Sequence, residues 1–253
     1  MSRLHGSKDF WLGALRADGP AFRAAVTEAP LDAPVPSCPD WTVVDLVHHL
    51  GAVYAWVREH VVRGVVDPPT VRSDMTGRPG GDEALVWWQQ EFDALVNLLD
   101  GLDPELPAWN WAPQAKKAAF WPRRMAHETA VHRWDAQTAI AGVEPVEAKL
   151  AADGISEVLD SWLPAGRRRR RQPAYGVAHL VATDAEQEWY VRLRGEGMAL
   201  LDTDTILDSD DHHTRTLATG TASDLLLGLW GRVQFDVLDV SGDAALLDAL
   251  RVG

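Results

Sequence analysis

Two residues in one predicted helix have the spacing of a metal-binding pair. Glu128 and His132 are four positions apart, so on a helix both project from one face, where a divalent ion can bridge them. His127 lies five positions before His132, which puts these two histidines about 140° apart around the helix and excludes the His-Glu-x-x-His arrangement of zinc proteases. The alternative for Glu128 and His132 is an ordinary intrahelical hydrogen bond.

A histidine in an earlier predicted helix, His49, is a third candidate. It falls on the apolar stripe that includes Leu46, whereas His48 falls on another side of the helix. A lone inward histidine is more often a core residue bonded to a carbonyl group. Combined with Glu128 and His132, however, His49 completes a set of two histidines and one glutamate, which is a ligand type of catalytic zinc with an open fourth position.

Burying these three side chains without a metal would be costly. An unpaired carboxylate and unpaired imidazoles need partners or shifted pKa values, and one divalent ion satisfies all of them at once. Asp135, three positions after His132, either accepts a hydrogen bond from that histidine or faces solvent.

Helical patterns dominate the first two thirds of the chain and must position these residues. Apolar residues recur at intervals of three and four, and prolines and glycines separate the segments. Gly19 and Pro20 are expected to kink or split the first helix, and Thr42 with Asp45 resembles a capping box at the start of the second. The predicted helices span residues 9–28, 42–63, 82–100, 122–140 and 147–163.

The character of the sequence changes after residue 164. A Pro- and Gly-bearing stretch with the arginine run Arg167–Arg171 predicts an exposed linker at 165–174. Beyond it, alternating apolar and polar residues predict strands, and two short helices are expected after Thr221 and at 243–250. The predicted strands are 175–181, 189–193, 198–201, 214–218 and 235–240. We therefore predict an α+β protein, with a helical domain at 1–164 and a smaller α+β domain at 175–253.

Composition excludes several classes of function. A net charge of −13 argues against a general nucleic-acid binder. The single cysteine, Cys38, excludes internal disulfides and cysteine-cluster zinc sites. No apolar run approaches the roughly 18 to 20 residues of a membrane span, and residues 1–9 lack the apolar core of a signal peptide, so a cytoplasmic protein is expected. The histidines of Asp211-His212-His213 are expected to be solvated.

Three segments carry a resemblance to a known family. They are VPSCPDWTVVDLVHHLG at 35–51, HETAVHRWD at 127–135 and GTASDLLLGLWGR at 220–232. Together they resemble the mycothiol-dependent maleylpyruvate isomerase family, within the DinB-like metalloprotein superfamily. The resemblance implies an N-terminal DinB-like four-helix bundle in which His49, Glu128 and His132 bind zinc or another divalent metal. It also implies a C-terminal α+β domain similar to sterol carrier proteins.

The same resemblance implies a zinc-dependent enzyme that activates a low-molecular-weight thiol, mycothiol, for addition to an electrophile. Cis–trans isomerisation of the maleylpyruvate type is the leading hypothesis, and a mycothiol S-transferase is the first alternative. A noncatalytic metal-containing protein that holds a small apolar ligand is the second alternative. A structural metal should have four protein ligands, and the sequence offers three convincing ones.

The resemblance further implies an arginine of the C-terminal domain in the active site, and Arg232 is the candidate. A guanidinium would suit a carboxylate of the substrate, although a surface arginine near a helix end is the alternative. The expected partners are a small thiol and an electrophilic substrate, without nucleic acid or membrane, and the protein is expected to be a monomer.

Overall fold

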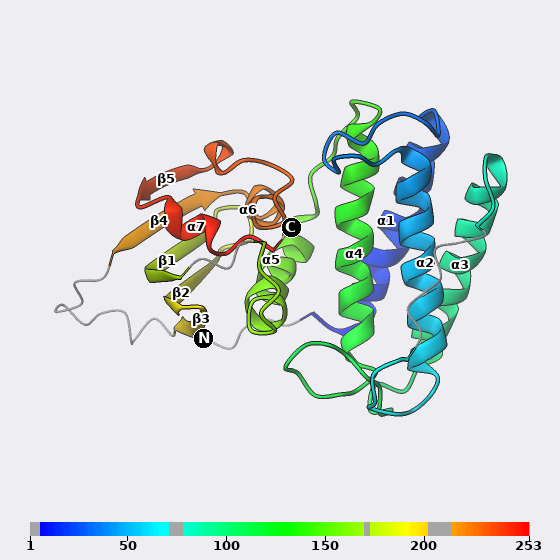
Figure 1. Cartoon of the computed structure of the whole chain (residues 1–253), viewed down its shortest axis with the longest axis horizontal. Helices are drawn as coiled ribbons and strands as arrows, with labels where there is room; N and C mark the ends of the chain where they lie inside the picture. The colour runs from blue at the N-terminus through cyan, green and yellow to red at the C-terminus, as the bar shows by residue number, and fades with distance from the viewer. Residues whose placement is uncertain (1–5, 71–77, 170–172, 202–213, 253) are drawn as a thin grey trace. The chain divides into compact units, whose positions relative to one another are not determined.

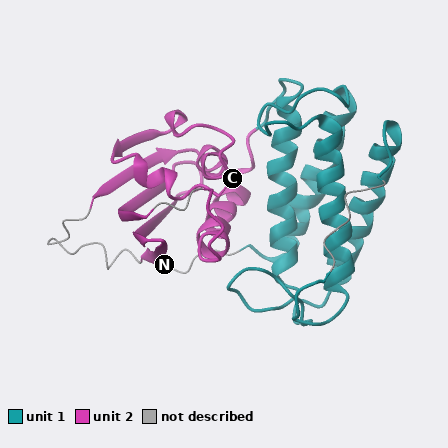
Figure 2. Ribbon diagram, in the orientation of Figure 1, with its two compact units in different colours: residues 1–144 teal, residues 145–253 magenta. Residues whose placement is uncertain are grey.

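The structure, a computed structural model, describes residues 6–70, 78–169, 173–201 and 214–252. The chain divides into two compact units, residues 1–144 and 145–253 (Figure 2). The predicted solvated histidines at 212 and 213, and part of the arginine run, lie outside the described residues. No described helix is both long enough and apolar enough to cross a membrane.

The described part of the first unit is a bundle of four helices (Figure 1). These are α1 (Lys8–Glu28), α2 (Val43–Val61), α3 (Asp82–Gly101) and α4 (Phe120–Thr138). The helix α1 packs along α4, and α2 packs along α3. The predicted four-helix bundle is therefore confirmed, with helix bounds close to those expected.

The start of α2 and its buried face follow from local sequence. The Thr42 hydroxyl accepts a hydrogen bond from the backbone N–H of Asp45, and the Asp45 carboxylate accepts one from the backbone N–H of Thr42. This capping box satisfies N–H groups that the first turn leaves without helical partners. Leu46 and Leu50 are fully buried, and His49 stands beside them, half-buried.

The helix α1 runs unbroken through Gly19 and Pro20, so the expected kink or split does not occur. Gly19 is buried where α1 approaches α3, and its missing side chain leaves room for the ring of Phe92. The Phe92 ring is stacked on Trp88, with ring centroids 5.3 Å apart. The glycine is therefore explained by close helix packing.

The helix α4 is buried on nearly every side although its sequence is polar. Buried polar groups are tolerated when they pair with one another. The hydroxyls of Tyr54 and Thr129 lie 2.6 Å apart, and Arg133 donates to Asp18 at 3.1 Å. The bundle therefore encloses a paired polar interior along α4, and the candidate site is part of it.

The second unit combines helices with one mixed sheet. Its described elements are α5 (Ala148–Glu157), continued by the π-helical turn η1 (Val158–Trp162), β1 (Ala174–Ala182), β2 (Gln187–Gly195), β3 (Gly197–Leu201), β4 (Arg215–Gly220), α6 (Ala222–Leu229), the 3-10 turn η3 (Phe235–Val237), β5 (Asp239–Gly242) and α7 (Ala245–Asp248). The strand order is β3-β2-β1-β4-β5. Only β1 and β4 pair in parallel among these neighbours, from Val177 opposite Arg215 to Ala182 opposite Gly220.

Two boundaries differ from those expected. The sequence interpretation ended the first domain at residue 164, whereas the units divide after residue 144, because α5 packs against α6 and Val146 N–H donates to Ser223 Oγ at 2.9 Å. The strand expected at 235–240 begins only at Asp239. The chain first makes a tight turn, in which Leu238 N–H bonds to the carbonyl of Phe235.

Candidate metal centre

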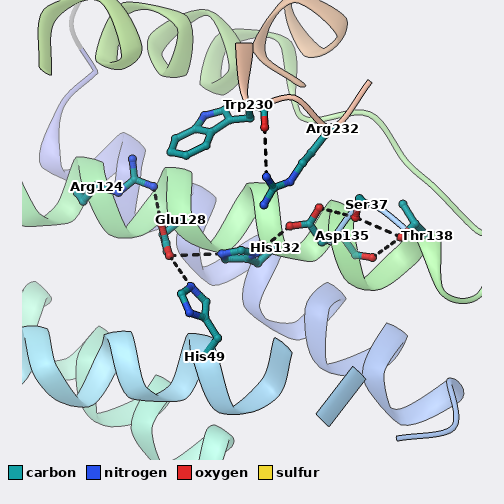
Figure 3. Close-up of polar contacts among 9 residues, drawn as sticks. All are labelled: Ser37, His49, Arg124, Glu128, His132, Asp135, Thr138, Trp230 and Arg232. Carbon is teal, nitrogen blue, oxygen red and sulfur yellow. Dashed lines mark hydrogen bonds and ion pairs between the residues drawn. The ribbon is translucent and has the colours of Figure 1, made fainter. Parts of the chain in front are cut away.

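Side chains of α2 and α4 meet within the first unit at His49, Glu128 and His132 (Figure 3). His49 Nε2 lies 3.2 Å from Glu128 Oε1, and His132 Nε2 lies 3.4 Å from the same oxygen. One ligand atom from each residue lies within 4.8 Å of the other two. The structure thus brings together the pair spaced along α4 and the inward histidine of α2.

The distances between these atoms fit a divalent ion. Zinc bonds of about 2.0–2.2 Å in a tetrahedral arrangement place neighbouring ligand atoms about 3.4 Å apart. Both distances to Glu128 Oε1 are close to that value. Among the described His, Cys, Asp and Glu side chains the group has only these three members, so a tetrahedral ion would retain one position for a small-molecule ligand.

The electrostatic surroundings keep Glu128 ionised. Burial raises the pKa of this carboxyl group, but hydrogen bonds from His132 and His49 and the charge of Arg124 outweigh burial and hold the pKa well below its usual value. Arg124, almost completely buried, donates to Glu128 Oε2 at 2.7 Å. One carboxylate oxygen is therefore bound by arginine, while the other faces the two imidazoles.

His132 is held through its second ring nitrogen. Nδ1 of His132 lies 2.8 Å from Asp135 Oδ2, and the Asp135 side chain is fully buried. Of the two environments considered for Asp135, the structure therefore shows the hydrogen bond to His132. Burial lowers the pKa of His132, but the hydrogen bonds to Asp135 and Glu128 outweigh it and raise the pKa to about 9.

Other histidines of the two helices point elsewhere. His48 Nε2 bonds to the carbonyl of Pro79 at 2.8 Å, and His127 is buried on another face of α4. His60 Nδ1 bonds to the carbonyl of Trp56 at 2.7 Å, and its ring packs against Trp109 and Trp121. These histidines do not join the group at His49.

Arg232 belongs to the second unit, directly after α6. Its Nη1 donates to the backbone carbonyl of Trp230 at 3.2 Å (Figure 3). The segment 220–232, which suggested this arginine from the sequence, forms the end of β4, the helix α6 and the turn that follows.

The two units correspond to two known domain types. The sequence profile described as the mycothiol maleylpyruvate isomerase N-terminal domain matches residues 12–137, and the profile described as the MDMPI C-terminal domain matches residues 149–249. The chain belongs to the mycothiol-dependent maleylpyruvate isomerase family. The gap between the matched segments contains the boundary between the units at residues 144 and 145.

Solved structures of this family share the fold. The crystal structure of the mycothiol-dependent maleylpyruvate isomerase is similar with a TM-score of 0.61 and 12% sequence identity, and the match covers 93% of each chain. A histidine-to-alanine mutant of that isomerase gives a TM-score of 0.63 with 10% identity and the same coverage. At these identities the likeness shows the fold alone. Among curated proteins, none matches the chain significantly.

Sequence reasoning missed two residues that support the candidate metal centre. Arg124 stands four positions before Glu128, so helical spacing alone could have suggested the pairing. Ser37, which contacts Asp135, gave no such signal, because the two residues are 98 positions apart and no spacing rule connects a loop to a helix.

Proposed function

We propose that this chain binds a divalent metal, zinc in the first instance, through His49, Glu128 and His132, and that it activates mycothiol for addition to an electrophile. The convergence of three ligand atoms from two helices within 4.8 Å carries the proposal. Membership of the mycothiol-dependent maleylpyruvate isomerase family supports mycothiol as the thiol. Maleylpyruvate-type cis–trans isomerisation is the leading reaction.

The residues around the site are suited to hold such a metal. Zinc lowers the pKa of a thiol bound to its open position, so it would supply a thiolate at neutral pH. Glu128 contributes a negative charge, and Arg124 fixes the orientation of that carboxylate. Asp135 accepts the hydrogen of His132 Nδ1, so Nε2, which would lose its own proton on metal binding, would present its lone pair towards the other two ligands.

Isomerisation by a thiol leaves the thiol unconsumed. The thiolate adds to a carbon–carbon double bond conjugated to a carbonyl, which makes that bond single, and rotation about it follows. Elimination of the thiolate then restores the double bond as the trans isomer. We assign to Arg232 the binding of a substrate carboxylate, because a guanidinium can hold a carboxylate through two hydrogen bonds.

An assay with maleylpyruvate and mycothiol tests this function. Proton NMR of the vinyl region should show conversion to the trans isomer with mycothiol well below the substrate concentration, and the mycothiol should be recovered. Glu128→Gln should abolish the conversion, whereas Glu59→Gln, an exposed change on α2, should leave it unchanged. Absence of any conversion by the zinc-loaded wild-type protein would contradict isomerisation.

The S-transferase alternative predicts a different result in an assay with mycothiol and an electrophile. Mycothiol would then disappear in proportion to the electrophile, and an S-conjugate would accumulate. A noncatalytic binding protein would produce neither change. The three-member ligand group favours catalysis over a structural metal, which normally has four protein ligands.

A further inference from the structure

The loop between α1 and α2 lies against the metal-site histidines. Its ends are joined by an isolated bridge between Pro34 and Thr42, and Val35 N–H bonds to the carbonyl of Trp41 at 2.9 Å. Inside the loop, Cys38 N–H bonds to the carbonyl of Val35 at 3.0 Å. The segment 34–42 is therefore a closed, internally bonded loop that can hold its side chains in fixed positions.

Ser37, in this loop, contacts Asp135, which is the hydrogen-bond partner of the candidate ligand His132. Ser37 Oγ donates to Asp135 Oδ1 at 2.6 Å, and Asp135 Oδ2 accepts from His132 Nδ1 at 2.8 Å (Figure 3). Both carboxylate oxygens are thus engaged, one by the loop and one by the imidazole. Because Asp135 is fully buried, losing the Ser37 hydroxyl would take a hydrogen bond away from a carboxylate oxygen inside the protein.

A second side chain of the loop packs on both imidazole rings. The Trp41 ring centroid lies 4.9 Å from that of His49 and 6.4 Å from that of His132, and the ring planes of Trp41 and His132 differ by 20°. The same short segment therefore contacts the rings of two of the three candidate ligands. The loop is in a position to restrict their rotation.

We propose that Ser37 is a positioning residue of the metal centre, which orients Asp135 and, through Asp135, His132. This inference rests on the proposed metal binding. Ser37 fixes the rotation of the Asp135 carboxylate, and the carboxylate then determines which histidine nitrogen carries hydrogen and where the Nε2 lone pair points. Without the hydroxyl, the Asp135 carboxylate can turn, and His132 must lose conformational freedom when the metal binds.

Cobalt binding by the full chain tests the proposal. Co²⁺ affinity is measured by competition with a chromophoric chelator, and the visible d–d absorption reports the geometry of the bound ion. Ser37→Ala should weaken Co²⁺ binding about tenfold and alter the absorption. Asp135→Asn should weaken binding by about 10- to 100-fold, because it changes the direct partner of His132. Ser37→Thr retains the hydroxyl and should restore both the affinity and the absorption.

A matched serine distinguishes positioning from a general loss of stability. Ser7 caps α1, where its hydroxyl accepts from Phe10 N–H at 3.2 Å. Ser7→Ala should destabilise the fold but leave Co²⁺ affinity and absorption at the wild-type values. Equal affinity and equal spectra for Ser37→Ala and the wild type would overturn the role of Ser37 while leaving the proposed function intact. A wild-type chain that binds no Co²⁺ would overturn both.

Discussion

The two carboxylate oxygens of Glu128 have different partners. Oε2 is bonded to Arg124 within α4, and Oε1 faces the imidazoles of His49 and His132. The arginine offsets the cost of burying the carboxylate and also leaves one oxygen for a metal. In the proposed metal complex, this division would favour coordination by Oε1 alone.

Removing Arg124 should therefore destabilise the metal-free protein. Arg124→Met removes the guanidinium that pairs with Glu128 Oε2 and leaves the imidazoles of His49 and His132 to pair with this largely buried carboxylate. Breaking a buried pair in this way should cost about 3 kcal/mol in the free energy of unfolding. Urea denaturation of the metal-free variant measures the change. Arg16→Met is the control, because Arg16 and Asp100 form a half-exposed ion pair worth at most about 1 kcal/mol. Equal losses in the two variants would contradict the account of Arg124.

At the scale of residues, the sequence predicted the candidate ligands better than their surroundings. Glu128 and His132 followed from helical spacing, and His49 followed from the apolar stripe of α2. The contact of Ser37 with Asp135 depends on where a loop folds back over α4. Spacing along the chain carries no information about such a tertiary contact.

Small residues at a few positions allow the helices to pack closely. Gly19 of α1 is one, because a methyl group at this position would overlap the Phe92 ring of α3. Gly13, in the same helix, has no atom within 4 Å of the position that a methyl group would take. Gly13 is therefore a control for the effect of a methyl group at Gly19.

Alanine substitution should have opposite effects at these two positions. Gly19→Ala should destabilise the protein by about 1–3 kcal/mol, because Phe92 is stacked on Trp88 and cannot move freely. Gly13→Ala should stabilise it by about 0.5–1 kcal/mol, because glycine in a helix interior is unfavourable. Thermal or urea unfolding measures both. Stabilisation by Gly19→Ala would contradict the close approach of Gly19 to the Phe92 ring.

A buried histidine near the end of α2 should make stability depend on pH. Burial lowers the pKa of His60 to about 4, and the nearby charge of Arg63 contributes to the lowering. Between pH 4 and 6.5 the unfolded chain thus binds more protons than the folded chain does, so this contribution to stability is present above pH 6.5 and is lost on acidification. From pH 7 to pH 5 the loss should be about 2 kcal/mol.

The comparison of wild type with His60→Leu isolates this contribution. The variant cannot take up the proton, so its free energy of unfolding should fall less between pH 7 and pH 5, as measured by urea denaturation of metal-free samples. Equal pH dependence in both proteins would mean that His60 ionises alike in the folded and unfolded states.

At the scale of elements, periodicity predicted the helices of the bundle and most strands, and its errors have physical causes. Gly19 and Pro20 were expected to interrupt α1, but the helix is continuous, and Gly19 serves the close contact of α1 with Phe92 of α3. The helix α5 was assigned to the first domain, because helical periodicity does not reveal which unit a helix packs against.

The whole molecule combines a helical unit that contains the candidate metal ligands with a sheet unit that contains Arg232. Arg232→Lys should impair turnover of a dicarboxylate substrate by about tenfold or more, because lysine cannot hold a carboxylate through two parallel hydrogen bonds. Zinc content should stay at the wild-type value, since no proposed ligand lies in the second unit. Arg194→Lys, an exposed change in β2, serves as the control. Unaltered turnover by Arg232→Lys would remove Arg232 from the reaction.

The most direct test of metal-dependent thiol activation is metal analysis of the purified chain, followed by addition of mycothiol to the cobalt-substituted protein. We expect about one metal ion per chain, loss of the metal in His49→Ala and Glu128→Ala, and a sulfur-to-cobalt charge-transfer band when mycothiol is added. A chain that takes up no metal on reconstitution, or a cobalt protein whose spectrum does not change with mycothiol, would contradict the account.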